Sequence, residues 1–279
     1  MTTTAIRLAP STPLAKIGAI FRRDAIVTLS YPGNFAISWV SILVEVVIAW
    51  YISMLVHPSA KYGGGSGEVA GYFQFIAINF AFVRFQTAAL NSFADAIRDG
   101  QLTGTLEVVL ATPTSLPVLV LSSGLWSFTL TALQTTFFLI VAVVFGLDLS
   151  HTNLLTAAVF LVLTIAAVSP LGVLAAALAM VIKKTGPVEW LSLASASLFG
   201  GVYVPLSSLA MWLQVIGSCL PISHALVGFR AAAAGVPLSH VAGEAVWLLG
   251  SAVLLTPLAL WIFVRAVNKA RVDGTLAMY

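Results

Sequence analysis

Residues 116–147, LPVLVLSSGLWSFTLTALQTTFFLIVAVVFGL, form a long run without one charged side chain. A helix that spans a membrane needs about 20 apolar residues. Membrane-spanning strands would instead show segments of about ten residues with alternating polarity. The run therefore predicts a transmembrane helix.

The composition extends this conclusion to the whole chain. Of 279 residues, 59% are hydrophobic and 8% charged, and the mean hydropathy is +1.02. Soluble domains carry about 25% charged residues. The single cysteine, Cys219, excludes an internal disulfide and a Cys-rich metal site. The four histidines have no metal-ligand spacing, so no metal site is expected; they are His57, His151, His224 and His240.

Five further apolar runs give six predicted transmembrane helices in an all-α membrane protein. The runs are Phe35–Val56, Tyr72–Phe93, Leu154–Ile182, Val188–Val204 and Ala245–Val264. Pro170 and Pro257 lie inside the fourth and sixth spans, where proline removes a helix hydrogen bond and predicts a kink. We divide the chain into a cytoplasmic N-terminus (1–34), a transmembrane domain (35–264) and a cytoplasmic tail (265–279). The first span is expected to be retained, because no cleavage pattern follows it.

The distribution of Lys and Arg predicts the orientation. With the N-terminus in the cytoplasm, ten of the 13 basic residues fall in inner segments, and Lys61 and Arg230 fall outside. The ten are Arg7, Lys16, Arg22, Arg23, Arg98, Lys183, Lys184, Arg265, Lys269 and Arg271. Inner loops of membrane proteins carry this excess, so both termini are expected in the cytoplasm. Orientation also explains the net charge of +3, so no nucleic-acid partner is expected.

The stretch before the first span, PLAKIGAIFRRDAIVTLSYP (13–32), predicts a short amphipathic helix that ends before Pro32. Apolar residues share one face and two basic residues lie opposite. The apolar residues are Leu14, Ile17, Phe21, Ala25 and Leu29, and the basic ones are Lys16 and Arg23. Such a helix beside a membrane span lies in the headgroup plane. A solvated leader is the alternative.

The segment DGQLTGTLEVVLATPTSLP (99–117) predicts a cytoplasmic helix over Gln101–Ala111. Leu102, Leu106 and Val109/Leu110 recur at helical spacing and form one apolar stripe, from which Glu107 is offset. Thr112-Pro113 ends the helix, because proline disfavours helical geometry in the preceding residue. Since so short a helix is marginal in water, it either docks into a partner or folds back on the inner face of the bundle.

Glu45 and Arg84 are the ionisable residues deepest in the predicted spans. At roughly 1.5 Å per residue, both lie about 15 Å from the inner boundary. Charges at such depth are costly and are usually paired. We therefore predict an intramembrane polar pair, formed directly or through Asn79, Gln86 or water. A role in the translocation path and separate snorkelling of the two side chains are the alternatives.

The segment between the fifth and sixth spans predicts an outer re-entrant hairpin. Gly200, Gly201 and Pro205 interrupt the fifth span, and Ser208–Leu220, which contains Trp212, is too short to cross before Pro221. Two short helical arms that meet at a bend are tolerated in a membrane where protein or water satisfies the backbone. The alternative is a frayed fifth span followed by an interfacial helix that Trp212 anchors.

Two motifs resemble those of ABC-2-type transporter permeases. IRDGQLTGTLEVVLATPTSLPVLVLSS (97–123) resembles their coupling segment, in which a Gly-Thr-Leu-Glu run and then Thr-Pro precede span three. GGVYVPLSSLAMWLQVIGSCLPISHALVGFRAAAAG (200–235) is similar to the family's segment between spans five and six. The chain departs from the family pattern at Gln101-Leu102, where relatives often carry charged residues.

The resemblance implies the permease subunit of an ATP-driven exporter in a prokaryotic plasma membrane. Its partners would be a separate nucleotide-binding ATPase subunit and a second copy or a paralogous permease. The ATPase-coupling residues would be Leu102, Thr105, Leu106, Glu107, Val109 and Leu110, and the outer hairpin would shape the exit. Implied cargo is amphiphilic: a drug, a lipid or a lipid-linked glycan or polysaccharide.

The sequence itself carries no ATP site, because no Gly-x-x-x-x-Gly-Lys-[Ser/Thr] loop occurs in it. ATP and Mg are thus expected on the partner subunit, and the chain is expected to bind no cofactor and to have no catalytic residues. A membrane enzyme would need clustered nucleophiles, bases or metal ligands, which are missing. An ion-coupled carrier, the other alternative, usually has internal repeats, and none is detectable.

Overall fold

The computed structural model describes residues 13–55, 61–62, 69–102, 104, 116–182 and 210–272. These residues are predominantly helical, which confirms the predicted fold class. The helices are α1 (Pro13–Leu29), α2 (Pro32–Leu55), α3 (Tyr72–Leu102), α5 (Leu116–Val144), α6 (Leu154–Ile182), α8 (Met211–Cys219), α9 (Pro221–Ala233), the 3-10 helix η4 (Leu238–Val241) and α10 (Ala242–Val272). A short antiparallel ribbon joins β1 (Lys61–Tyr62) to β2 (Val69–Ala70), with Lys61 opposite Ala70.

Five of the described helices are long and apolar enough to cross a membrane: α2, α3, α5, α6 and α10. The count rises to six if α8 and α9, which meet at an angle of 86°, are taken together as one broken span. The predicted fifth span, Val188–Val204, lies outside the described residues. The chain is thus a multi-span helical membrane protein.

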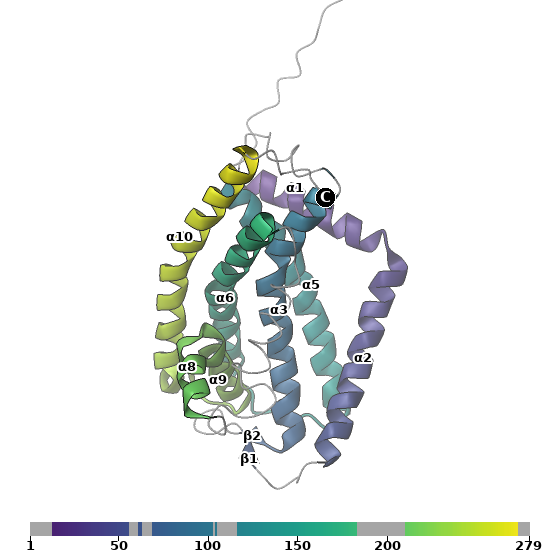
Figure 1. Ribbon diagram of the computed structural model, residues 1–279. Coiled ribbons are helices and arrows are strands. Elements are labelled where there is room, and N and C mark those ends of the chain that lie inside the picture. The colour runs from purple at the N-terminus through teal and green to yellow at the C-terminus, as the bar shows by residue number, and fades with distance from the viewer. Residues whose placement is uncertain are drawn as a thin grey trace, which may run out of the picture.

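The long helices run side by side between two ends of the molecule (Figure 1). At the upper end, which we call the α1 end, α1 lies across the bundle near the last turns of α3, α6 and α10. The lower end, which we call the hinge end, holds α8, α9 and the β1–β2 ribbon. The chain leaves α6 at the α1 end and resumes in α8 at the hinge end.

The core centres on α6, which packs against α3, α9 and α10. Phe93 of α3, Val173 of α6 and Phe263 of α10 belong to one buried cluster. The backbones of α3 and α6 approach closely, because a Cβ on Gly172 would lie 2.1 Å from the carbonyl oxygen of Ala89. Small residues allow such an approach between membrane helices, so Gly172 fixes how α3 and α6 pack.

Several helices extend beyond the apolar runs that predicted them. α3 continues past Phe93 to Leu102, and α10 continues past Val264 to Val272. The predicted start of a separate helix at Gln101 was wrong, because Gln101 and Leu102 form the end of α3. Gly104 follows with a φ of +66°, a left-handed conformation that favours glycine and ends a helix.

Candidate functional site

The structure brings Glu45 of α2 and Arg84 of α3 together in a direct ion pair between Oε2 and Nη2. The side chains are 33% and 17% exposed, respectively. The guanidinium carbon of Arg84 lies 5.4 Å from the ring centroid of Phe138 on α5, which is within the range of a cation–π contact. Three helices therefore meet at this pair.

Apolar packing positions the two charges. Ile42, Val46 and Ala49 form the buried face of α2. Ile42 and Val46 pack in one cluster with Ala81 of α3 and Phe138 of α5. Glu45 is next to Val46 in this helix and is thus carried to the seam with α3. The apolar face of α2 decides where the carboxylate lies.

Further polar groups line the seam between α2 and α5. Gln134 Nε2 donates to Ser38 Oγ over 3.4 Å, and Thr135 is buried one turn before Phe138. Arg84 Nε and Thr135 Oγ1 are buried and have no hydrogen-bond partner within the described part of the chain. Buried polar atoms of this kind are commonly satisfied by water, so the seam can hold water beside the ion pair.

Asn79, which the sequence offered as a bridge for the ion pair, bonds Arg230, and the ion pair itself is direct. Arg230 Nε donates to Asn79 Oδ1 over 2.9 Å, and the guanidinium lies 4.4 Å from the ring centroid of Phe75. Arg230 is 4% exposed, and Asn79 is fully buried. The sequence placed Arg230 in an outer segment but gave no sign of this contact, since the two residues lie 151 positions apart.

The bent pair of helices α8 and α9 contains two of the predicted gate residues, one at the bend and one at the start of α8. Pro221 is buried at the first position of α9, where its missing N–H costs no helix bond. Trp212 of α8 is exposed, as suits a residue at a membrane interface. The other three, Gly200, Gly201 and Pro205, lie outside the described residues.

Of the predicted coupling residues, Leu102 lies at the end of α3. The other five, Thr105, Leu106, Glu107, Val109 and Leu110, lie outside the described residues. The last turn of α3 and the first turn of α5, which flank this segment, both lie at the α1 end (Figure 1).

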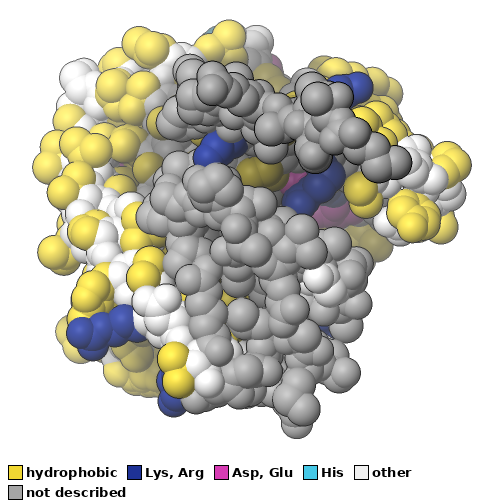
Figure 2. Space-filling view, turned by 90° about the horizontal axis from the view of Figure 1, so that it is seen from above, with side chains coloured by type: hydrophobic (Ala, Val, Ile, Leu, Met, Phe, Trp, Pro, Cys, Tyr) yellow, Lys and Arg dark blue, Asp and Glu magenta, His cyan; other side chains and the backbone are white. Residues whose placement is uncertain are grey.

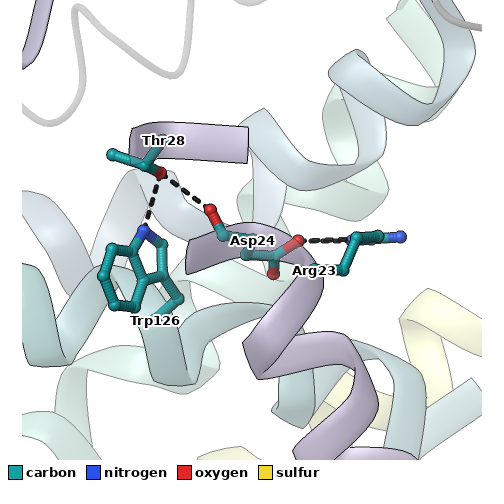
Figure 3. Close-up of polar contacts among 4 residues, drawn as sticks. All are labelled: Arg23, Asp24, Thr28 and Trp126. Atoms are coloured by element: carbon teal, nitrogen blue, oxygen red, sulfur yellow. Dashed lines mark hydrogen bonds and ion pairs between the residues drawn. The ribbon is translucent and has the colours of Figure 1, made fainter. Parts of the chain in front are cut away.

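The helix α1 is fastened to α5 at this same end. Trp126 Nε1 donates to Thr28 Oγ1 over 2.7 Å, and the Thr28 hydroxyl donates to the carbonyl oxygen of Asp24 over 2.9 Å (Figure 3). The ring of Trp126 meets that of Phe21 edge to face at 5.4 Å. Arg23 Nε donates to the Asp24 carboxylate over 2.8 Å. The contacts of Trp126 with Thr28 and Phe21 hold α1 against α5.

The α1 end is rich in basic side chains. Of the eight Lys and Arg side chains that the structure describes, six lie there, namely Lys16, Arg22, Arg23, Arg98, Arg265 and Lys269. Viewed from this end, basic side chains occur at several places around the face, and a hollow exposes acidic and basic groups beside one another (Figure 2). Such an excess at one end is typical of the cytoplasmic side.

Comparison with known families identifies the chain. A model of ABC-2 family transporter proteins matches residues 31–261. The chain belongs to this family. It is therefore an ABC-2 permease, and members of that family are generally non-catalytic membrane subunits that work with an ATPase subunit in the lipid bilayer. No curated protein matches the chain.

The ABC-2 match includes α2 to α9 and most of α10. The ion pair of Glu45 and Arg84, the seam beside it and the hinge all fall within it. The helix α1 precedes residue 31 and is outside the match.

Proposed function

We propose that this ABC-2 permease is the transmembrane subunit of an ATP-driven exporter. It forms the translocation path with a second copy or a paralogous permease, and a separate subunit binds and hydrolyses ATP with Mg. The family match over residues 31–261 carries the proposal. It agrees with the missing phosphate-binding loop in the sequence.

The ATPase subunit is proposed to dock on residues 102–110, at the α1 end. The supporting observation is that α3 ends and α5 begins there, so the connecting segment starts and finishes at one end of the bundle. Leu102, Leu106 and Val109/Leu110 would supply an apolar contact and Glu107 a salt link. A push on this segment acts directly on the last turn of α3.

The α1 end is proposed to face the cytoplasm of a prokaryotic cell, with both termini on that side. Its excess of Lys and Arg supports this orientation. The hinge end would then face outward, and α8–α9 would form the outer gate. Gly200, Gly201, Pro205, Trp212 and Pro221 are the proposed gate residues.

Glu45 and Arg84 are proposed to fix α2 against α3 within the bilayer, where a lone charge is costly. A place on the translocation path is the other role that their partial exposure permits. Cargo is proposed to be amphiphilic, such as a drug, a lipid or a lipid-linked glycan or polysaccharide. The apolar surface of the bundle and the scarcity of charge support this class.

The docking proposal is tested by Leu106→Asp, which puts a charge into the apolar stripe. The variant should insert and assemble with its partner permease but lose co-purification with the ATPase subunit. Ser239→Asp is the matched control, because it adds the same charge to an exposed position in η4 at the hinge end and should retain the ATPase. Undiminished co-purification of Leu106→Asp would overturn the docking site.

ATP dependence separates this function from ion-coupled transport. Proteoliposomes that contain the permease and its ATPase subunit should transport cargo with ATP and without an ion gradient. Transport by the permease alone, driven by an ion gradient, would support the secondary carrier instead.

A further inference from the structure

His224, in the first turn of α9, joins three helices at the hinge end. Its Nε2 lies 2.7 Å from the carbonyl oxygen of Ser218 in α8, and its Nδ1 contacts the carboxylate of Glu244 in α10. The imidazole stacks on the indole of Trp247, with centroids 4.0 Å apart and planes at 20°. One ring thus bridges the 86° bend between α8 and α9 and ties it to α10.

The two hydrogen-bond partners of this ring are both acceptors. A backbone carbonyl cannot donate, and neither can an ionised carboxylate. A neutral imidazole has only one N–H, so it can donate to Ser218 or to Glu244 but not to both. Satisfying both contacts requires one more proton, either on the ring or on the Glu244 carboxyl group. In either position, the pair holds one proton more than a neutral imidazole beside a carboxylate.

We propose that His224 and Glu244 together form a proton-binding site that closes the α8–α9 hinge onto α10. With the proton bound, the ring holds Ser218 and Glu244 at the same time. When the proton leaves, a lone pair faces one of the two acceptors, and that contact becomes repulsive. The hinge then opens on the side of the lost contact.

The surroundings leave Glu244 as the charged partner of the ring. Among the described residues, α6 carries no ionisable side chain, α8 carries Cys219, and η4 carries His240, which contacts Ser239. The Arg230 guanidinium, on α9 itself, is bonded to Asn79. The remaining ionisable residues on α3 and α10 are Tyr72, Arg84, Asp95, Arg98, Asp99, Arg265, Lys269 and Arg271.

Trp247 adds to the effect of the proton. A cation stacked on an indole is attracted by the face of the ring, whereas a neutral imidazole lacks this attraction. The closed hinge therefore gains both a hydrogen bond and a cation–π contact when the proton resides on His224. The side chains of His224 and Glu244 are 19% and 33% exposed, so protons can exchange with the solvent.

Histidine is the side chain that ordinarily changes charge between pH 5 and 8. Acidification at the hinge end should thus close the hinge, and a more alkaline medium should open it. A one-proton switch changes the ratio of closed to open molecules by at most about tenfold per pH unit. That the relevant medium is the one outside the cell rests on the orientation proposed above.

The native sequence supplies a reporter for this motion. Cys219 is the single cysteine of the chain, is exposed, and follows Ser218 directly. A nitroxide spin label on Cys219 of the purified permease in nanodiscs should report the mobility of α8 by electron paramagnetic resonance. Between pH 8 and pH 5 the label should become less mobile in a single one-proton transition.

Two variants with opposite expected outcomes test the site. Glu244→Gln should be closed at every pH, because the amide NH₂ donates to Nδ1 while the neutral ring donates from Nε2 to Ser218. His224→Gln should be open at every pH, because both amide N–H groups are on a single nitrogen and cannot reach the two acceptors that the two ring nitrogens contact. His240→Gln, the matched control in η4, should keep the transition of the unmodified protein.

A transition that survives in either His224→Gln or Glu244→Gln, or that disappears in His240→Gln, would overturn the proposal. Size-exclusion chromatography identifies variants that fail to assemble. If His224→Gln does not fold, Glu244→Gln still tests the proposal, because it keeps the contacts of the His224 ring with Ser218 and with residue 244. In proteoliposomes of known orientation, a response to the pH on the α1 side alone would contradict the outward placement and leave the proton site intact.

Discussion

Neutralising one member of the Glu45–Arg84 pair should destabilise the permease strongly, whereas neutralising both should not. Glu45→Gln leaves the Arg84 guanidinium without its carboxylate, and Arg84→Gln leaves the carboxylate without its cation. In the double variant, two amides face each other at the same depth and can hydrogen bond. The pair thus suits a double-mutant cycle.

The magnitude follows from depth and exposure. A charge at the centre of a membrane helix costs about 2.5–3.5 kcal/mol on insertion scales. Both side chains are a third exposed or less, with Phe138 beside the guanidinium, so solvent relieves only part of this cost. Each single variant should lose about 2–3 kcal/mol of unfolding free energy, and the double variant about 1 kcal/mol or less.

Equilibrium unfolding in mixed micelles, with helical content followed by circular dichroism as the fraction of denaturing detergent rises, measures these free energies. The coupling between the two positions should reach about 3 kcal/mol or more, because each single variant leaves one buried charge unpaired. Transport by the reconstituted complex is measured on the same four proteins. A structural role predicts that the double variant regains both stability and transport.

A coupling energy below about 0.5 kcal/mol would refute the reasoning, since the effects of distant and independent sites add to within that amount. Wild-type stability in all variants together with lost transport would instead favour a role of the pair on the translocation path.

Two other contacts give further predictions. Gly172→Ala should cost about 1–3 kcal/mol in the same unfolding assay, because its Cβ forces α3 and α6 apart. The control Gly250→Ala has nothing within 4 Å of its Cβ, so it should be neutral or stabilising by up to about 1 kcal/mol. Equal losses of stability in the two variants would contradict the close approach of α3 and α6. Trp126→Phe keeps an aromatic ring but removes the donor to Thr28, so it should cost about 1 kcal/mol and speed tryptic cleavage within α1. Thr28→Val should have the same effect, and the two changes should not add.

Apolar runs predicted the spanning helices well where no charge interrupts them. The predicted and observed bounds of α6 are both Leu154–Ile182. The runs failed at the ends of α3 and α10, because hydropathy follows the edge of the membrane rather than the end of the helix. Asp95 and Arg98 are compatible with a helix in water, so α3 continues until Gly104 turns the backbone. The residue at which α3 ends therefore depends on backbone conformation, which hydropathy does not report.

The polar pairs likewise include one that the sequence predicted and two that it did not. Glu45 and Arg84 were predictable partners, because two deep charges at equal depth on successive helices have few other solutions. Arg230 with Asn79 and His224 with Glu244 were not predictable, since each pair depends on how α9 lies against its neighbours. Helical spacing describes one helix at a time and carries no information about that packing.

The helix packing that the sequence did not predict would also transmit the proposed push from the α1 end to the hinge end. Because a Cβ does not fit between Gly172 and α3, the proposed push on the last turn of α3 at the α1 end would move α6 as well. The opposite half of α6 packs on α9, where the Phe160 ring occupies the space of a Cβ on Gly228. A displacement of α3 would therefore reach α9 through two rigid contacts, and α9 carries His224. The proton on the His224–Glu244 pair then sets how firmly the hinge resists that displacement, so the same push should open the hinge more readily at alkaline than at acidic pH.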